Sequence, residues 1–241
     1  MPTRRDNAVV LRLSDYSETS QIVTLFTNDA GLVRLIAKGA RRSTKTRFAV
    51  GLDLLEAGEV RFATPRGGAS LGTMLEWVQT DGFLDLRHDL PRIYAALYAA
   101  ELTIALTEEY DPHARLYDSL LELFRALSGP GELPPDAVVR FQAGILRATG
   151  FAPNLRSCNV CNTPRMRGAP AYFSSERGGL ICRECEVHLT EKRAVSADLV
   201  DYGRERSEAS DWFTLLHYHL KHLAGKKLRT SAPIVAVFDR R

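Results

Sequence analysis

Four cysteines, arranged as two C-x-x-C pairs, constrain this 241-residue chain more than any other feature. The pairs are Cys158 with Cys161 and Cys182 with Cys185, and the chain has no other cysteine. Two thiolates three positions apart can bind one ion across a tight turn, and a second pair completes a tetrahedron. This spacing is typical of a structural zinc site. We therefore predict one Zn²⁺ per chain, bound by all four cysteines.

The alternatives to a zinc site are two disulfides or four unrelated buried thiols. No apolar signal-peptide core precedes Asp15, which favours a reducing, cytoplasmic compartment where disulfides are rare. A catalytic zinc keeps one position open for water, whereas four cysteines fill the coordination shell. A nucleobase deaminase would also need a His-x-Glu motif, and the sequence contains none. We expect the metal to stabilise the fold.

The charge of the chain is segregated, although the formal net charge is only +3. Residues 34–47 include six basic residues and no acidic one, while residues 101–122 include six acidic residues and one arginine. No apolar run is long enough to span a membrane, since the longest candidate, residues 95–106, is interrupted by Glu101. We expect a soluble protein with one basic surface.

Residues 8–79 alternate short apolar stretches with turn residues, which is the pattern of a small antiparallel barrel. Five strands are predicted, near residues 8–13, 21–27, 32–38, 54–62 and 70–77. Five strands in about seventy residues suit an OB-like or SH3-like barrel. The period of two in the third strand places Val33, Leu35 and Ala37 on one face and Arg34 and Lys38 on the other.

A basic, hydroxyl-rich loop, residues 39–48, follows this strand. Cations neutralise phosphates, Ser43, Thr44 and Thr46 can donate hydrogen bonds, and Phe48 offers a stacking face to an unpaired base. A loop kept basic for solubility is the plainer alternative. The adjoining strand favours nucleic acid, because OB barrels bind oligonucleotides at this position. The predicted DNA contacts are Arg34, Lys38, Arg41, Arg42, Lys45 and Arg47.

Helical periodicity replaces strand alternation near residue 80. Helices are predicted from residue 90 to Tyr110, after Asp111-Pro112, after Pro134-Pro135 up to Gly150, and over residues 212–223. A hairpin is expected between the cysteine pairs, and residues 233–238 are expected to be extended. The resulting parts are an OB-fold nucleic-acid-binding domain (residues 1–80), a helical domain (81–157 and 186–241) and an inserted zinc-binding element (158–185).

Three histidines of the last long helix do not share one helix face. His217, His219 and His222 lie at offsets of two and three residues, so they cannot all converge on one ion. We expect surface or partly packed histidines there and no second metal site.

In the order of its motifs the chain resembles the RecO family of bacterial DNA repair proteins, which are recombination mediators. The matching segments are residues 9–11, 16–27, 31–32, 37–42, 158–161 and 178–182. Asn162 departs from the family, in which a glycine often follows the second cysteine; asparagine tolerates the positive φ expected at this turn.

The resemblance implies a multidomain α+β protein with an OB-fold barrel, a helical domain and a zinc-binding element. It implies binding of single- and double-stranded DNA, strand annealing, and recombinase loading on strands coated with single-stranded DNA-binding protein, together with RecR in the RecF pathway. A cytoplasmic location with nucleoid association during repair is expected. The chain has no Walker A motif, and annealing needs no bond chemistry, so we expect no enzyme and no ATP hydrolysis.

A basic segment near the end of the chain is a candidate partner site. Lys226, Lys227 and Arg229 could contact the acidic tail of single-stranded DNA-binding protein. The alternative function is a zinc-containing protein–protein adaptor with little intrinsic DNA affinity. A hydrolytic function has no support, because no nucleophile–base signature is found.

Overall fold

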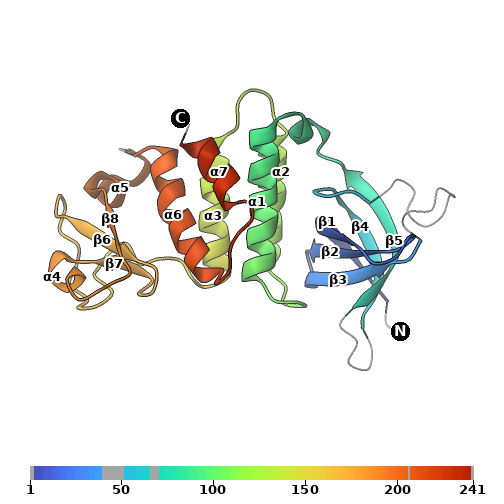
Figure 1. Cartoon of the computed structure of the whole chain (residues 1–241), viewed down its shortest axis with the longest axis horizontal. Coiled ribbons are helices and arrows are strands. Elements are labelled where there is room, and N and C mark those ends of the chain that lie inside the picture. The colour runs from blue at the N-terminus through green and yellow to red at the C-terminus, as the bar shows by residue number, and fades with distance from the viewer. Residues whose placement is uncertain (1–2, 40–51, 66–70, 206, 240–241) are drawn as a thin grey trace. The chain divides into compact units, whose positions relative to one another are not determined.

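The computed structural model describes residues 3–39, 52–65, 71–205 and 207–239. It divides into two compact units, Met1–Leu133 and Pro134–Arg241 (Figure 1). The domain boundary predicted near residue 80 marks the change from strands to helices. The two compact units are instead defined by which residues contact one another, so their boundary lies later, after Leu133. None of the helices in the described ranges combines the length and the apolar character that a membrane crossing requires.

Five strands of the first unit close into a barrel (Figure 1). They are β1 (Thr3–Asp15), β2 (Gln21–Thr27), β3 (Gly31–Ala37), β4 (Ala57–Ala63) and β5 (Gly72–Asp81). The order around the barrel is β1-β2-β3-β5-β4, β1 also pairs with β4, and β3 runs parallel to β5. This arrangement confirms the predicted OB-fold. β4 begins at Ala57 rather than at residue 54, because Leu55 has a φ of 65°.

The barrel is filled by side chains that alternate along its strands. Val33, Leu35 and Ala37 are fully buried in this core, together with the large side chains of Phe62 and Trp77. The alternation predicted for the third strand is therefore confirmed: the intervening Arg34 and the following Lys38 are exposed.

Helices cover part of the outer barrel wall within the first unit. α1 (Leu90–Leu106) contacts β1, and α2 (Ala114–Leu127) contacts β2, after the short η1 (Leu84–His88). Val9, Phe26 and Leu32 pair across β1, β2 and β3 in one register row, and all three are buried. The Phe26 ring lies 6.4 Å from that of Tyr117 on α2. This row of the outer wall is consequently closed to solvent.

The connection between α1 and α2 differs from the prediction. α1 ends at Leu106, and Tyr110 has a φ of 62° and donates its N–H to the Leu32 carbonyl at 2.9 Å. A Cβ at Gly31 would lie only 2.0 Å from the Asp111 carbonyl oxygen, so only glycine permits this approach. The helix stops early because its chain continues along β3.

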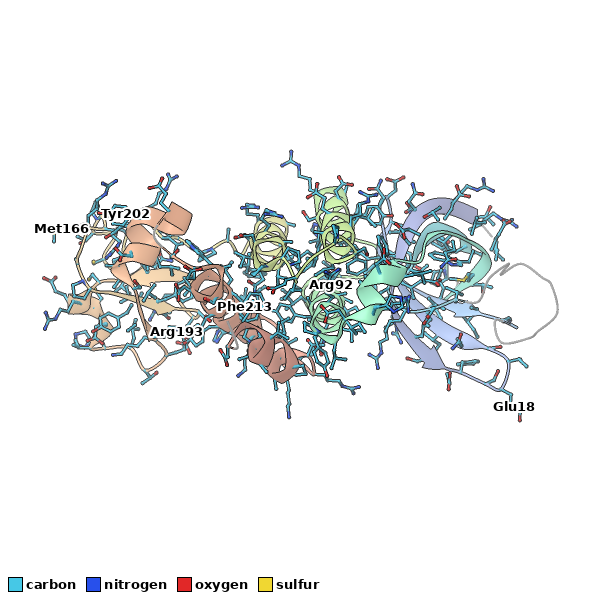
Figure 2. All side chains as sticks on the ribbon, turned by 90° about the horizontal axis from the view of Figure 1, so that it is seen from above. Glu18, Arg92, Met166, Arg193, Tyr202 and Phe213 are labelled. Atoms are coloured by element: carbon cyan, nitrogen blue, oxygen red, sulfur yellow. The ribbon has the colours of Figure 1, made fainter. Side chains whose placement is uncertain are left out.

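A buried arginine holds the end of α2. The Arg92 guanidinium donates to the carbonyls of Leu127 at 2.7 Å and Gly129 at 2.6 Å, and also to that of Gly131 (Figure 2). These carbonyls would otherwise lack partners at the helix terminus. Arg92 is therefore a structural cation and is not available to a ligand.

The second unit packs helices against a small sheet. Its helices are α3 (Pro135–Ala148), α4 (Arg183–Glu186), α5 (Ala197–Tyr202), η2 (Gly203–Glu205), α6 (Ala209–Leu223) and α7 (Ser231–Phe238). The sheet has the order β7-β6-β8, from β6 (Ala171–Ser174), β7 (Gly179–Ile181) and β8 (Arg193–Val195). The hairpin predicted between the cysteine pairs is β6–β7.

One prediction for the end of the chain is wrong. Residues 233–238 belong to α7 and are not extended, because Ile234 and Phe238 bury one helix face and the Phe238 ring stacks 3.7 Å from that of Phe213. Of the histidines expected to be at the surface or partly packed, His217 and His219 are packed more deeply than predicted and are buried. His222 is exposed, as expected.

Candidate DNA-binding face and metal centre

The outer face of β1, β2 and β3 continues beyond the helices as a surface that carries cations. Arg12 pairs with Thr24, and Thr24 pairs with Arg34, so the three side chains form one row across the strands. The next row is formed by Ser14, Ile22 and Ile36. We call these two rows, with Tyr16, Ser20 and Lys38 beyond them, the open barrel face. It combines three cations with a partly exposed apolar floor.

A shallow hollow of about 320 Å³ lies at the end of the open barrel face. Its lining residues are Tyr16, Thr19, Ser20, Ile36, Lys38 and Gly39. Tyr16 is 60% exposed, and its backbone N–H donates to the Ser20 carbonyl at 3.0 Å, which holds the turn between β1 and β2. An exposed aromatic ring beside a lysine offers a stacking face and a phosphate contact together.

Arg34 is less free than Lys38. Its Nη1 lies 3.6 Å from Glu109 Oε1, because Glu109 pairs with Leu32 alongside β3. Both side chains are exposed, so the ion pair contributes little to stability. The carboxylate nevertheless reduces the positive potential that Arg34 presents to a phosphate.

The predicted DNA contacts are placed only in part. Arg34 and Lys38 lie on the open barrel face, whereas Arg41, Arg42, Lys45 and Arg47 are outside the described residues. Arg12 was missed, because simple alternation puts it on the same side as the core residue Val10. A β-bulge between Val10 and Arg12 reverses this alternation. Tyr16 was also missed, although an aromatic residue beside hydroxyl residues was a usable signal.

The four cysteines converge, as their spacing predicted. Their Sγ atoms all lie within 4.8 Å of one another, and those of Cys161 and Cys182 are 3.8 Å apart. Four sulfurs placed about 2.3 Å from a central ion form a tetrahedron with edges of about 3.8 Å. A disulfide would need about 2.05 Å, and all four cysteines are free. The cluster therefore has the dimensions to bind one metal ion.

The turn around the first pair supports the cysteines. Asn162 has a φ of 60°, as expected, and donates its N–H to the Cys158 carbonyl at 2.9 Å. The backbone N–H groups of Cys182 and Val160 donate to Cys158 Sγ at 3.3 and 3.5 Å. Such bonds stabilise a thiolate, which is the form that binds metal.

The pKa values of the cysteine thiols are also consistent with binding of a cation. The Thr163 hydroxyl lowers the pKa of Cys161 to about 6, and the hydrogen bond with Cys182 raises the pKa of Cys185 to about 12. Burial raises the pKa of Cys158, but hydrogen bonds from backbone N–H groups outweigh it and lower the pKa. Four thiolates this close repel one another, so complete ionisation needs a positive ion between them.

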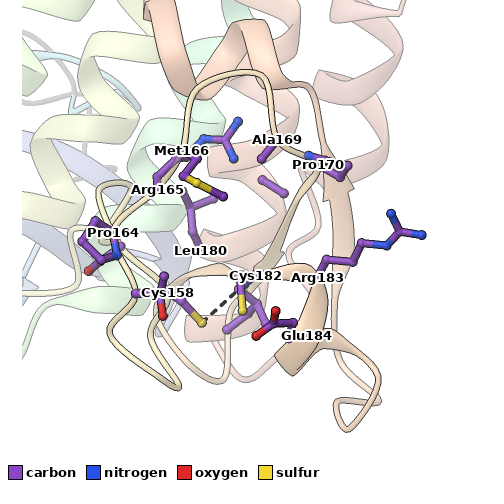
Figure 3. A pocket seen from close by; sticks show the side chains of 14 residues that line it. Cys158, Pro164, Arg165, Met166, Ala169, Pro170, Leu180, Cys182, Arg183 and Glu184 are labelled. Atoms are coloured by element: carbon purple, nitrogen blue, oxygen red, sulfur yellow. Dashed lines mark hydrogen bonds between the residues drawn. The ribbon is translucent and has the colours of Figure 1, made fainter.

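An apolar pocket of about 240 Å³ adjoins the metal centre (Figure 3). Met166, Ala169, Pro170 and Leu180 line it beside Cys158 and Cys182. Arg165, which also lines it, is held by Asp201 through an Nε–Oδ1 contact of 2.8 Å.

The predicted partner residues lie outside the cavities described above. Lys226, Lys227 and Arg229 are exposed and follow Gly225, whose φ of 61° ends α6. Their assignment to a partner stays a prediction.

Comparisons with known proteins agree over both units. The family model "Recombination protein O N terminal" matches residues 1–83, and "Recombination protein O C terminal" matches residues 87–217. A protein of Rhodopirellula baltica named DNA repair protein RecO is 35% identical over 82% of this chain and 73% of its own length. Proteins with the same name are 39% identical in Anaeromyxobacter sp. (strain K), over 73% of this chain and 68% of theirs, and 33% identical in Myxococcus xanthus, over 85% and 82%. The chain belongs to the RecO family of DNA repair and recombination proteins.

Proposed function

We propose that this chain is a recombination mediator that binds DNA on the open barrel face and anneals complementary strands. The observation that carries the proposal is the row in which the exposed cations Arg12 and Arg34 flank the buried Thr24, continued by the exposed Tyr16 and Lys38. The basic residues that follow Gly39 in the sequence add further positive charge.

The chemistry of this face suits an unpaired strand of any sequence. Cations contact phosphates, and the Tyr16 ring stacks on a base, which every base permits. Both single- and double-stranded DNA offer the phosphates that the cations require. Annealing follows because neutralised backbones can approach each other while base pairing supplies the free energy. No ATP is consumed in such a process.

We infer that the metal is one Zn²⁺ and that it holds the structure. Four thiolates with tetrahedral spacing are the donor set of a closed zinc site. All four coordination positions are filled by Cys158, Cys161, Cys182 and Cys185, so the ion offers no position for a substrate.

We further propose that the protein assists recombinase loading on strands coated with single-stranded DNA-binding protein, in the cytoplasm at the nucleoid and with RecR as partner. The acidic tail of the single-stranded DNA-binding protein would contact Lys226, Lys227 and Arg229, which are exposed near one another in sequence. This part of the proposal rests on family membership and on charge complementarity.

A strand-annealing assay at two salt concentrations, with and without single-stranded DNA-binding protein, tests the function. We expect annealing without ATP, weakened by salt, and reduced several-fold by Tyr16→Leu and more strongly by Lys38→Glu. Arg61→Glu is the control, because Arg61 lies on β4 outside the open barrel face and pairs with Glu76 at 3.0 Å. Equal annealing by Lys38→Glu and the parent would refute the assignment of this face. Negligible DNA affinity with stable partner complexes would instead support the adaptor.

A further inference from the structure

The four cysteines of the metal centre, all of which the structure describes, differ in how accessible they are to solvent. Cys158 is buried, with 4% of its surface exposed, and Cys182 and Cys185 are half-buried, whereas Cys161 is exposed. Oxidants react with the thiolates that they can reach, and cysteine sulfurs bound to a metal are thiolates. Cys161 is therefore the first sulfur that a dissolved oxidant meets.

The sulfur of Cys182 lies close to that of Cys161. The two Sγ atoms are 3.8 Å apart, and a disulfide needs about 2.05 Å, so a movement of about 2 Å joins them. Cys161 lies in a turn beside the exposed Asn162, where its side chain can move without displacing buried groups. An oxidised Cys161 consequently has a second thiolate within reach.

Cys158 is a less available partner for Cys161, although the two belong to one C-x-x-C pair. Its Sγ accepts a hydrogen bond from the backbone N–H of Cys182 at 3.3 Å (Figure 3) and another from that of Val160 at 3.5 Å. A buried sulfur held in this way would lose both bonds on moving towards Cys161. The geometry therefore favours a disulfide between Cys161 and Cys182.

A hydroxyl group lies beside the exposed sulfur. Thr163 Oγ1 is 3.1 Å from Cys161 Sγ, and the hydroxyl is the donor when the sulfur is a thiolate, which has no proton. Donors placed where negative charge develops stabilise a transition state. Hydroxide leaves when a thiolate attacks a peroxide, so Thr163 is placed to donate a hydrogen bond to the departing oxygen.

We propose that Cys161 and Cys182 are a reversible oxidation site for hydrogen peroxide, and that a disulfide between them replaces two of the four metal bonds. In the first step the Cys161 thiolate attacks one peroxide oxygen, the O–O bond breaks, an S–O bond forms and hydroxide leaves. In the second step the Cys182 thiolate attacks the Cys161 sulfur, the S–O bond breaks and a second hydroxide leaves. The two sulfurs lose two electrons, the peroxide gains them, and two protons from solvent convert both hydroxides to water.

The positions of the two cysteines make the oxidation reversible. Cys158 and Cys185 alone supply half of a tetrahedral shell, so the ion is released. The disulfide nevertheless joins the turn of Cys161 to the start of α4, so the two segments stay linked. A thiol reductant then restores both thiolates, and the site binds the ion again. The inference rests on the proposed Zn²⁺ and is independent of DNA binding by the open barrel face.

Titration of the full-length, zinc-loaded protein with hydrogen peroxide tests the proposal. We expect a chromogenic chelator to detect one equivalent of released zinc for each equivalent of peroxide consumed. Dimedone, which traps sulfenic acids, should label Cys161 before any other cysteine. Dithiothreitol with added zinc should restore one bound equivalent.

Peptide mapping identifies the disulfide. Trypsin cuts after Arg183 and so separates Cys182 from Cys185, while Cys158 and Cys161 stay in one peptide. We expect this peptide to be linked to the one that contains Cys182, with fragment ions that place the link at Cys161.

Thr163→Val tests the role of the hydroxyl, and it retains all four cysteines. Iodoacetamide is the reference reagent, because it alkylates the same sulfur but releases iodide, a much weaker hydrogen-bond acceptor than hydroxide. The rate with peroxide divided by the rate with iodoacetamide should fall about fivefold, the effect of one lost hydrogen bond. Thr214→Val, on α6, is the control, because its hydroxyl donates to the Ser210 carbonyl at 2.7 Å, and it should keep the ratio of the parent.

Three outcomes would overturn the proposal: zinc that stays bound when peroxide is added, first labelling at the buried Cys158, or a disulfide confined to one C-x-x-C pair. An unchanged ratio in Thr163→Val would exclude the hydroxyl from the reaction. The zinc content before oxidation separates this inference from the metal assignment. Well below one equivalent would refute both, whereas one equivalent that peroxide does not release would refute the oxidation site alone.

Discussion

The metal centre and the open barrel face are built in opposite ways. The metal centre takes its candidate ligands from two short segments, the turn of Cys158 and Cys161 and the start of α4 at Cys182 and Cys185, in which local spacing brings each pair together. The open barrel face takes Arg12, Thr24 and Arg34 from three strands, which only the register of the barrel brings together. A site built from a local motif can therefore be predicted from the sequence, whereas a surface assembled across several strands cannot.

The two regions also differ in what stabilises them. The barrel encloses its own apolar core, which includes Val23, Leu25, Leu35, Phe62 and Trp77. The sheet beside the cysteines has a smaller core around Phe173 and Leu180. Small elements with few buried side chains commonly depend on a metal for folding. The barrel should therefore survive changes that unfold the cysteine region.

Removal of one cysteine ligand should have the largest effect. Structural zinc sites contribute about 10–16 kcal/mol of apparent free energy in small domains, so Cys158→Ser should lower the free energy of unfolding of the cysteine region by several kcal/mol. Hydrogen exchange, measured residue by residue, should show lost protection in β6 and β7 and retained protection in β2 and β3.

Val160→Ala is the matched control, because Val160 lies between the two cysteines of the first pair and is exposed. It should bind one equivalent of metal and exchange as the parent does. Equal loss of protection in the barrel and in the cysteine region would contradict the independence of the two regions.

Acidification should have the second largest effect, by lowering the free energy of unfolding of the second unit. Burial lowers the pKa of His217 from 6.5 to about 4. Above the unfolded value both states are neutral. As the pH falls below the pKa of the unfolded state, His217 is protonated in the unfolded state but remains neutral in the native state. The free energy of unfolding therefore falls by up to about 3 kcal/mol by about pH 4. Urea unfolding of the second unit at several pH values measures this loss.

His217→Gln should flatten that pH dependence, whereas His222→Gln should not, because His222 is exposed. The Gln side chain can still approach Ser231, whose Oγ lies 2.9 Å from His217 Nε2 in the native protein. A pH profile identical in the two variants would exclude His217 as the cause.

Loss of the three cations of the open barrel face should have the third largest effect. It should weaken DNA binding by a free energy slightly smaller than the loss of stability on acidification, and it should not affect folding. Each phosphate contact to a single strand contributes about 0.7 to the slope of log K against log salt. Replacing Arg12, Arg34 and Lys38 by serine should reduce the slope by about 2 and the affinity about a hundredfold at 0.1 M salt. Fluorescence anisotropy with an oligothymidine measures both quantities.

Arg61→Ser, on β4, is the control for this substitution and should leave the slope unchanged. An unchanged slope in the triple variant would show that the open barrel face does not contact phosphates.

Removal of the ion-pair partner of Arg34 should have the smallest effect, and it should strengthen DNA binding rather than weaken it. Glu109→Gln removes the carboxylate that lies 3.6 Å from the guanidinium, so Arg34 becomes a better phosphate ligand. An exposed ion pair is worth about 0.2–1 kcal/mol, so DNA affinity should rise about twofold at low salt. Glu76→Gln, which releases Arg61 outside the open barrel face, should cause no such gain, and a gain of equal size would attribute the effect to net charge alone.

Much of the fold was predictable because its signals are local. Alternation along β3 assigned Val33 and Leu35 to the core, and the turn beside Asn162 was expected from its position after Cys161. The end of α1 was not predictable, since Thr107 to Asp111 leave the helix in order to run beside β3 and past Gly31. The helix α7 was also missed, because packing of Phe238 on Phe213 outweighs the strand preference of Val235 and Val237.

The sequence alone determined the four-cysteine cluster, the strand pattern of the barrel and the membership of the chain in its family, because each depends on residue type at fixed spacing. The tertiary structure decided which cations lie together on the open barrel face. A bulge after Val10 turned Arg12 outward, Glu109 came to lie against Arg34, and folding buried Cys158 while Cys161 stayed exposed. These features depend on contacts between residues far apart in the chain, and local spacing contains no information about them.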